Sequence, residues 1–203
     1  MECYLRAESV ETGTSGTRFE LICSDGARAW MRTRLLGEYN VRDIALCAAV
    51  AHRLGMTLDE IARGVEKLKP LRHQLQLVSK GDLNVIDDSG NALPEGAAEA
   101  LRVLRDFPGR RILVTAGLTE LESDAEDKNF ALGTQVVGCA DYVILIGPEQ
   151  TRALMSGLMS RKFPKSSVRM VQDEADAAAL VREIAEKGDS VLYEGVWPDA
   201  DGD

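Results

Sequence analysis

The sequence predicts an α/β protein: a mostly parallel β-sheet with helices on both faces, preceded by a small β-hairpin and a pair of helices. Two observations support this fold class. From Leu75 onward, short apolar runs alternate with segments of helical periodicity, which is typical of a parallel sheet covered by helices. The run Tyr142–Ile146 is apolar at every position, as expected of a strand buried on both faces.

The first 34 residues have the pattern of β structure. Phe19, Leu21 and Cys23 occupy alternate positions, so they share one face of a strand. The sequence Ser-Asp-Gly at 24–26 is a turn signal, and residues 27–34 resume as the partner strand. A lone hairpin is only marginally stable, so this one needs another surface to pack on.

Two helices follow with no strand between them. Asn40 is predicted as the N-cap of the first, whose apolar residues recur at helical spacing until Gly55. The sequence Thr-Leu-Asp-Glu at 57–60 is a capping box, which predicts a second helix running to about Leu68. Pro70 then stops that helix.

The remainder of the chain supplies the alternating elements. We place the boundary at Lys69–His73, which gives two domains, residues 1–70 and 71–203. Strands are predicted at Leu75–Val78, Leu83–Ile86, Arg111–Thr115, Tyr142–Ile146, Val168–Val171 and Ser190–Tyr193. Helices are predicted at Pro94–Phe107, Asp124–Cys139, Glu149–Arg161 and Asp173–Lys187.

Composition excludes several classes of function. The formal charge of −9 argues against a nucleic-acid partner, which needs a basic face. No apolar run approaches the roughly 20 residues that span a bilayer, and the first residues are not those of a signal peptide. The four cysteines show no C-x-x-C spacing, which favours free thiols in a reducing cytoplasm, and two histidines exclude a histidine-rich metal site.

The chemistry is predicted to centre on the segment Leu83–Pro94, where a strand runs into two acids, a polar turn and a helix start. Ligands of α/β sheets bind outside the carboxyl ends of strands, and helix N-termini there offer N–H groups to anions. Asp87 and Asp88 could therefore hold a ribose hydroxyl or stand near a magnesium ion. The alternative is a turn-forming, helix-capping acid pair.

Three further positions are candidates, and two of them have structural alternatives. His73, next to the predicted domain boundary, is either a ligand contact or a structural histidine. Glu120, in the loop after the strand ending at Thr115, is either a polar site group or part of an ordinary loop. Glu194 ends the last strand. Because the sequence contains no phosphate loop, dinucleotide fingerprint or G-x-S-x-G elbow, we assign no catalytic residue and no metal ligand.

Several of these motifs, taken in order, resemble the C-terminal half of a Mur ligase, most closely the type that adds D-alanyl-D-alanine to the UDP-MurNAc-tripeptide. The resemblance covers nearly the whole chain. The motifs that carry it are Gly37-x-x-Asn40-x-x-Asp43, the helix pair, Leu68-Lys69-Pro70, His73-x-Leu75, Asp87-Asp88-Ser89-Gly90-Asn91-Ala92-x-Pro94, Val114-Thr-Ala-Gly-Leu-Thr-Glu-Leu121, and Tyr193-Glu194 with Pro198-Asp199.

The resemblance implies a Rossmann-like C-terminal domain at residues 71–203, preceded by the last part of a central ATPase domain at residues 1–70. The UDP-binding domain and most of the ATPase domain, including its phosphate loop, would be absent. Family chemistry is ATP-dependent amide formation through an acyl phosphate, with ATP and Mg²⁺ bound in the complete enzyme. The C-terminal domain closes over ATP and presents the incoming amine.

Residues carry over position by position. The resemblance implies nucleotide contacts for Asn40, His73, Asp87 or Asp88, and Asn91, and substrate contacts for Glu120 and Glu194. Four positions depart from the family pattern, each removing a donor or a stacking surface that would face ATP. They are Tyr39 in place of histidine, Asp43 in place of asparagine, Gln74 in place of arginine, and Gly90 in place of an aromatic residue.

These inferences define one main hypothesis and two alternatives. The main hypothesis is the C-terminal part of a cytoplasmic cell-wall precursor ligase, inactive by itself, that binds a nucleotide and a small-molecule precursor. The first alternative is a non-catalytic binding or assembly module derived from a Mur ligase, using the face around residues 27–39 to bind a second copy or another protein. The second is a stand-alone Rossmann-like nucleotide binder.

Overall fold

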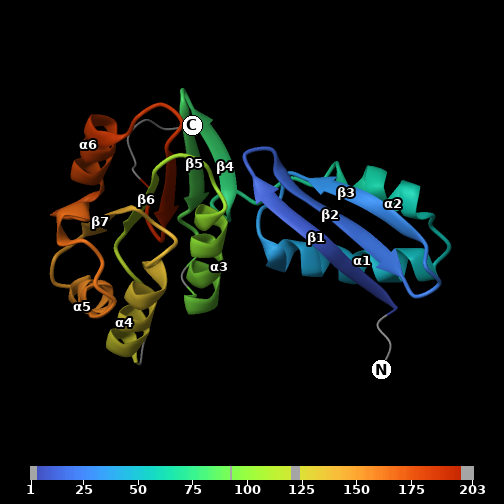
Figure 1. The fold of residues 1–203 in the computed structure, drawn as a ribbon, viewed down its shortest axis with the longest axis horizontal. Coiled ribbons are helices and arrows are strands. Elements are labelled where there is room, and N and C mark those ends of the chain that lie inside the picture. The colour runs from blue at the N-terminus through green and yellow to red at the C-terminus, as the bar shows by residue number, and fades with distance from the viewer. Residues whose placement is uncertain (1–3, 92, 120–123, 198–203) are drawn as a thin grey trace. The chain divides into compact units, whose positions relative to one another are not determined.

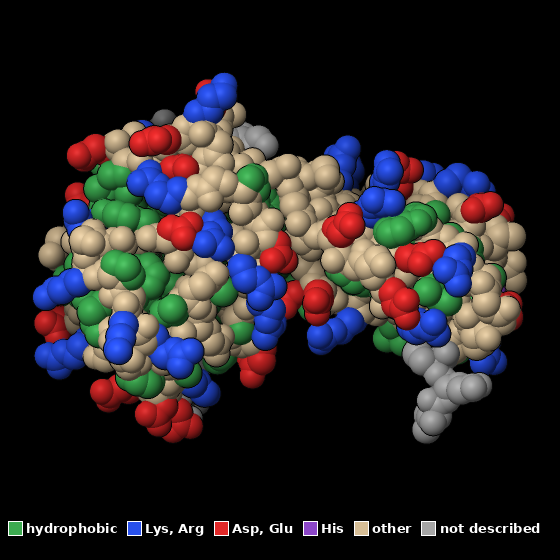
Figure 2. Space-filling view, viewed as in Figure 1, with side chains coloured by type: hydrophobic (Ala, Val, Ile, Leu, Met, Phe, Trp, Pro, Cys, Tyr) green, Lys and Arg blue, Asp and Glu red, His purple; other side chains and the backbone are tan. Residues whose placement is uncertain are grey.

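The computed structural model describes residues 4–91, 93–119 and 124–197. The chain divides into two compact units, Met1–Leu71 and Arg72–Asp203, each with its own sheet (Figure 1). Among the described residues, no helix is long and apolar enough to cross a membrane. On the face shown in Figure 2, basic and acidic side chains are interspersed over both units.

Unit 1 is a three-stranded antiparallel sheet with two helices. The predicted hairpin is present as β2 paired with β3, and an additional strand, β1, pairs with the other edge of β2. Phe19, Leu21 and Met31 are completely or almost completely buried against both helices, which gives the hairpin the packing surface that it needs. The elements are β1 (Leu5–Gly13), β2 (Gly16–Cys23), β3 (Arg28–Thr33), α1 (Glu38–Arg53) and α2 (Leu58–Val65).

The start of α1 corrects one prediction. The N-cap is Gly37, whose φ of 87° favours glycine, and not Asn40. Asn40 lies in the first turn, where its Nδ2 donates a hydrogen bond 2.7 Å long to the carbonyl oxygen of Leu36. The capping box of α2 is confirmed, because Thr57 and Glu60 exchange both hydrogen bonds.

Unit 2 is a six-stranded sheet in the order β4-β5-β9-β6-β7-β8, in which only the edge strand β4 is antiparallel to its neighbour. Its strands are β4 (Gln76–Lys80), β5 (Leu83–Asp88), β6 (Arg111–Thr115), β7 (Tyr142–Ile146), β8 (Val168–Val171) and β9 (Ser190–Glu194). Its helices are α3 (Pro94–Arg105), α4 (Ala125–Val136), α5 (Arg152–Ser160), the short 3-10 helix η1 (Lys165–Ser167) and α6 (Glu174–Ile184).

Helices cover both faces of this sheet, as predicted. Ala177 and Val181 of α6 pack on one face, against residues such as Val114 and Tyr193. Leu113 and the other alternate strand residues point to the opposite face, where α3, α4 and α5 lie (Figure 1). The connections explain this division, because β5-α3-β6-α4-β7-α5-β8 advances across the sheet whereas α6 returns the chain to β9.

Two boundaries differ from the prediction in ways that affect the site. β5 continues through Asp87 and Asp88, so both acids belong to the strand instead of following it. α5 begins at Arg152, three residues later than predicted. The preceding residues form a turn, in which Gln150 and Thr151 donate side-chain hydrogen bonds back to the end of β7.

Candidate functional site

The polar residues predicted from the sequence gather at the carboxyl ends of β5, β9 and β6. Asp88, Glu194 and Thr115 lie in one row across these three parallel strands, since Asp88 pairs in register with Glu194 and Glu194 with Thr115. Asp87 is one residue earlier and therefore points to the other face of the sheet. The acid pair of the sequence thus forms two separate clusters.

The first cluster surrounds Asp87, which is 2% exposed. Its Oδ2 lies 2.7 Å from Nδ1 of His73, and its Oδ1 accepts hydrogen bonds from the hydroxyl of Ser89 (2.7 Å) and from the backbone N–H of Ser89 (3.0 Å). His73 has φ 65° and stands 6.2 Å from the ring of Trp197, measured between centroids. The hydroxyl oxygen of Ser89 contacts Nδ1 of His73, the same nitrogen that faces Asp87. A nucleophile–base–acid relay needs the two groups on opposite ring nitrogens, so these residues do not form one.

The second cluster surrounds Asp88, which is 1% exposed. Its Oδ1 accepts a hydrogen bond from the backbone N–H of Leu75 (2.8 Å), and its Oδ2 accepts one from Nδ2 of Asn91 (2.9 Å). Its backbone carbonyl accepts from Asn91 and Gly195 as well. Asp88 therefore joins the segment entering unit 2, the turn before α3 and the segment leaving β9.

Glu194 is the unusual member of this row. It is 2% exposed. If Glu194 and Asp88 are both ionised, both can only accept hydrogen bonds, and neither carboxylate oxygen of Glu194 then has a partner among the described residues. Burial, with a further contribution from the neighbouring Asp88 carboxylate, raises the pKa of Glu194 well above its usual range. Burial raises the pKa of Asp88 also, opposed by its bond from Asn91 and by hydrogen bonding with Glu194.

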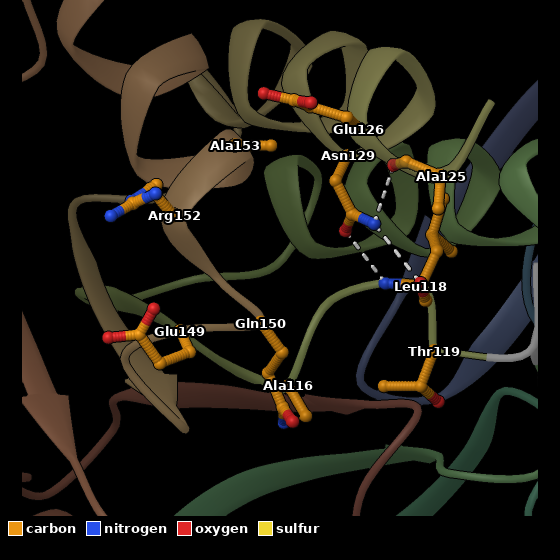
Figure 3. Close-up of a pocket in the computed structure, with 10 residues that line it drawn as sticks. All are labelled: Ala116, Leu118, Thr119, Ala125, Glu126, Asn129, Glu149, Gln150, Arg152 and Ala153. Atoms are coloured by element: carbon orange, nitrogen blue, oxygen red, sulfur yellow. Dashed lines mark hydrogen bonds between the residues drawn. The ribbon is translucent and has the colours of Figure 1, made fainter.

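An open hollow of about 450 Å³ lies at the carboxyl ends of β6 and β7, between the N-terminal ends of α4 and α5 (Figure 3). Its charged side chains are Glu126, Glu149 and Arg152, and none of the three has an ion-pair partner within 4.0 Å in the described part of the chain. Its lining residues are Ala116, Leu118, Thr119, Ala125, Glu126, Asn129, Glu149, Gln150, Arg152 and Ala153.

Asn129 of α4 holds the wall of this hollow. Its Oδ1 accepts from the backbone N–H of Leu118 (2.8 Å), and its Nδ2 donates to the carbonyl oxygens of Leu118 (3.0 Å) and Ala125 (2.9 Å) (Figure 3). Gly117 makes this possible: it has φ 77°, and a Cβ there would lie 2.5 Å from Oδ1 of Asn129. The sequence suggests close backbone approach at Gly117 but gives no signal that Asn129, eleven residues later, is the partner.

The structure thus brings together part of the predicted set. His73 lies with Asp87, and Asn91 and Glu194 lie with Asp88. Asn40 belongs to unit 1, and Glu120 lies outside the described residues. Arg152, Glu149 and Glu126 were not predicted as site residues. Glu149 and Arg152 follow a Gly-Pro turn, where charged residues are commonplace, so nothing in the local sequence distinguishes them from ordinary turn residues.

The fold and the hollow define a Rossmann-like α/β domain with a charged ligand-sized site at the carboxyl edge of its sheet. Residues 73–196 match the family described as "Mur ligase, glutamate ligase domain". Because this match covers more than half of the chain, the chain belongs to the Mur ligase family, and the predicted resemblance is confirmed.

Relatives by sequence include three kinds of peptidoglycan precursor ligase. The chain is 26% identical to a UDP-N-acetylmuramoyl-tripeptide--D-alanyl-D-alanine ligase of Treponema pallidum over 94% of its length and 40% of the relative's. It is 25% identical to a UDP-N-acetylmuramoyl-L-alanyl-D-glutamate--2,6-diaminopimelate ligase of Lactiplantibacillus plantarum, and 31% identical to a UDP-N-acetylmuramoylalanine--D-glutamate ligase of Rubrobacter xylanophilus. These matches cover 96% and 93% of the chain, but 39% and 41% of the relatives.

Solved structures show the same fold. A MurF structure from Acinetobacter baumannii superposes with a TM-score of 0.78 at 23% identity, over 95% of this chain and 42% of that one. A MurF ligase from Thermotoga maritima, solved in complex with ADP, gives a TM-score of 0.77 at 20% identity, over 94% and 42%. The chain therefore spans about 40% of the length of such proteins. Mur ligases are ATP-dependent, so ATP binding is a property of the family.

Proposed function

We propose that this chain is the C-terminal part of an ATP-dependent amide ligase of cytoplasmic peptidoglycan precursor synthesis. In this proposal unit 2 closes over ATP and presents the incoming amine, and unit 1 is the last part of the central ATPase domain. The chain by itself forms no amide, because its sequence contains no phosphate loop. The observation that carries the proposal is the hollow beside β6 and β7, which offers charges of both signs to a small ligand.

The lining of the hollow suits an amino acid or short peptide. Such an acceptor carries a carboxylate and an ammonium group at neutral pH. Arg152, in the first turn of α5, combines a guanidinium with the partial positive charge of a helix N-terminus, which favours the carboxylate. Glu149 and Glu126 supply the negative charge that favours the ammonium group. Holding both ends fixes the amine for attack on an acyl phosphate, a contribution of position rather than of proton transfer.

Nucleotide contacts at Asn40, His73, Asp87, Asp88 and Asn91 are part of the same proposal. The side chain of His73 is 35% exposed and lies beside Trp197, so an imidazole and an indole are available to a base or ribose. Asp87 and Asp88 would act mainly through His73 and Asn91, since each acid is almost fully buried. The described residues contain no group of three acidic, histidine or cysteine ligands that fits a metal ion. In this proposal Mg²⁺ binds with ATP in the complete enzyme, where one or two carboxylates and the phosphates of ATP are enough to hold it.

Amide NMR of the ¹⁵N-labelled chain tests the amine site. We expect D-alanyl-D-alanine at millimolar concentration to shift resonances of the β6–α4 and β7–α5 loops, and Arg152→Met to weaken binding at least tenfold. Arg161→Met, at the opposite end of α5, is the matched control and should leave binding unchanged. If no shift occurs in these loops, or if both variants bind equally well, the hollow is not the amine site.

One observation favours the assembly alternative. Leu46 and Val50 of α1 and Leu54, the residue that caps the end of this helix, recur every fourth residue and are 68%, 56% and 82% exposed. They form an apolar stripe that points away from the core of unit 1. Within residues 27–39, where the sequence placed the contact, Trp30 and Tyr39 are 43% and 36% exposed. Sedimentation velocity on the wild type and on Leu46→Glu separates the two ideas: a dimer that the substitution dissociates would support assembly through α1.

A further inference from the structure

Asp88 and Glu194 form a buried carboxyl pair with unequal surroundings. They sit opposite each other on the neighbouring parallel strands β5 and β9, and both are at most 2% exposed. Both oxygens of Asp88 already accept an N–H donor, from Leu75 and from Asn91. Glu194 accepts none from the residues that the structure describes. An ionised carboxylate with no donor is very costly at such burial, whereas a protonated carboxyl can satisfy itself by donating.

The described neighbours offer Glu194 no positive charge. On the β6 side its register partner is Thr115, whose hydroxyl oxygen accepts from the N–H of Gly117. On β5, Asp87 is a second negative charge but faces the other side of the sheet. From α3, which packs on β9, the buried acid Glu99 is paired with Arg102 at 2.7 Å. The charged group that acts on Glu194 is therefore Asp88.

We propose that Glu194 is a neutral carboxylic acid at pH 7 that donates a hydrogen bond to the carboxylate of Asp88, and so acts as the positioning residue for the turn that leads into α3. Through Asp88, the bond connects the end of β9 with the N–H of Leu75 and the amide of Asn91. This inference goes beyond the proposed function and does not depend on the identity of the nucleotide or the amine.

The pair makes the stability of unit 2 fall as the pH rises above about 4.5. Because the pKa of Glu194 is raised in the folded state, its stabilising contribution is fully present below the ordinary glutamate value of 4.5 and is lost as the pH rises toward and through the folded pKa. Loss of the proton to solvent places two carboxylates side by side with one set of donors between them. Repulsion then acts against the junction of β5 and β9.

Carboxyl ¹³C NMR of the whole chain tests the protonation state directly. We expect one glutamate side-chain carboxyl to keep the chemical shift of the acid form at pH 7, and that signal to be missing from Glu194→Gln. If every glutamate carboxyl is ionised by pH 6, the proposal is wrong. The measurement uses the wild-type protein, so it does not depend on whether a variant folds.

Denaturant unfolding at several pH values tests the positioning role. A glutamine at position 194 can donate to Asp88 at any pH, so the folding equilibrium constant of the wild type should fall relative to Glu194→Gln by up to about tenfold per pH unit above pH 5. Glu194→Met fills the space without a donor and should be less stable than Glu194→Gln throughout. Glu183→Gln, exposed on α6, is the control and should follow the wild type. Equal pH slopes for the wild type and Glu194→Gln would overturn the proposal.

Discussion

Asn129→Ala should loosen the wall of the hollow, and the size of the effect follows from its three hydrogen bonds. The side chain is 5% exposed and bonds to both backbone groups of Leu118 and to the carbonyl oxygen of Ala125. Each such bond contributes about 0.5–1.5 kcal/mol, and alanine leaves the buried N–H and C=O of Leu118 without their partner. We therefore expect the free energy of unfolding of unit 2 to fall by about 1.5–4.5 kcal/mol.

The two tryptophans make this measurable for unit 2 alone. Trp30 belongs to unit 1 and Trp197 to unit 2, so in a Trp30→Phe background the fluorescence during urea unfolding reports on unit 2. Gln135→Ala changes an exposed amide on the same helix and should alter stability by no more than about 0.5 kcal/mol. If Asn129→Ala costs as little as this control, the three hydrogen bonds do not hold the loop as argued.

Two further predictions concern packing and acid stability. Gly157→Ala should destabilise the protein by about 1–3 kcal/mol, because an added Cβ on α5 would overlap a backbone carbonyl of α4. The control is Gly64→Ala on α2, where the space around the glycine is open. In the same urea assay it should be neutral or stabilising by up to about 1 kcal/mol. A hydrogen bond from Arg111 lowers the pKa of Asp141, so stability from this pair is present above the ordinary aspartate value of 3.8 and is lost as the pH falls through the folded pKa. Asp141→Asn should therefore be less stable than the wild type at pH 7, and the difference should shrink steadily as the pH falls below 3.8. A difference that stays constant from pH 7 into this acidic range would contradict this account.

Most of the fold was predictable because its signals are local. The apolar run Tyr142–Ile146 and the capping box at Thr57 each specify an element from a few neighbouring residues, and both are as predicted. The sequence does not predict β1 as a separate strand, because most residues of this strand are at least partly exposed and its apolar residues do not alternate clearly. The N-cap of α1 was misassigned because Asn40 is a good capping residue, but the turn at Gly37 starts the helix earlier.

The site was less predictable because its contacts are not local. The apolar pattern ends at Ile86, so Asp87 and Asp88 were expected beyond the strand as one acid pair. In the structure they complete β5, and the two-residue period of a strand directs them to opposite faces. Their partners include Glu194, more than 100 residues later, and no spacing in the sequence indicates that meeting.

The two halves of the sheet's carboxyl edge differ in the polar groups that they leave available to a ligand. At β5 and β9, Asp87 and Asp88 are buried and bonded to the protein, so a ligand can reach them only through groups such as His73. At β6 and β7, Arg152 and Glu149 stand in a hollow with no ion-pair partner among the described residues. A small charged ligand gains new charge interactions at the second half, whereas at the first it must displace existing ones. This difference supports the proposal that the amine acceptor binds beside β6 and β7, and that the β5–β9 half fixes the shape of the domain.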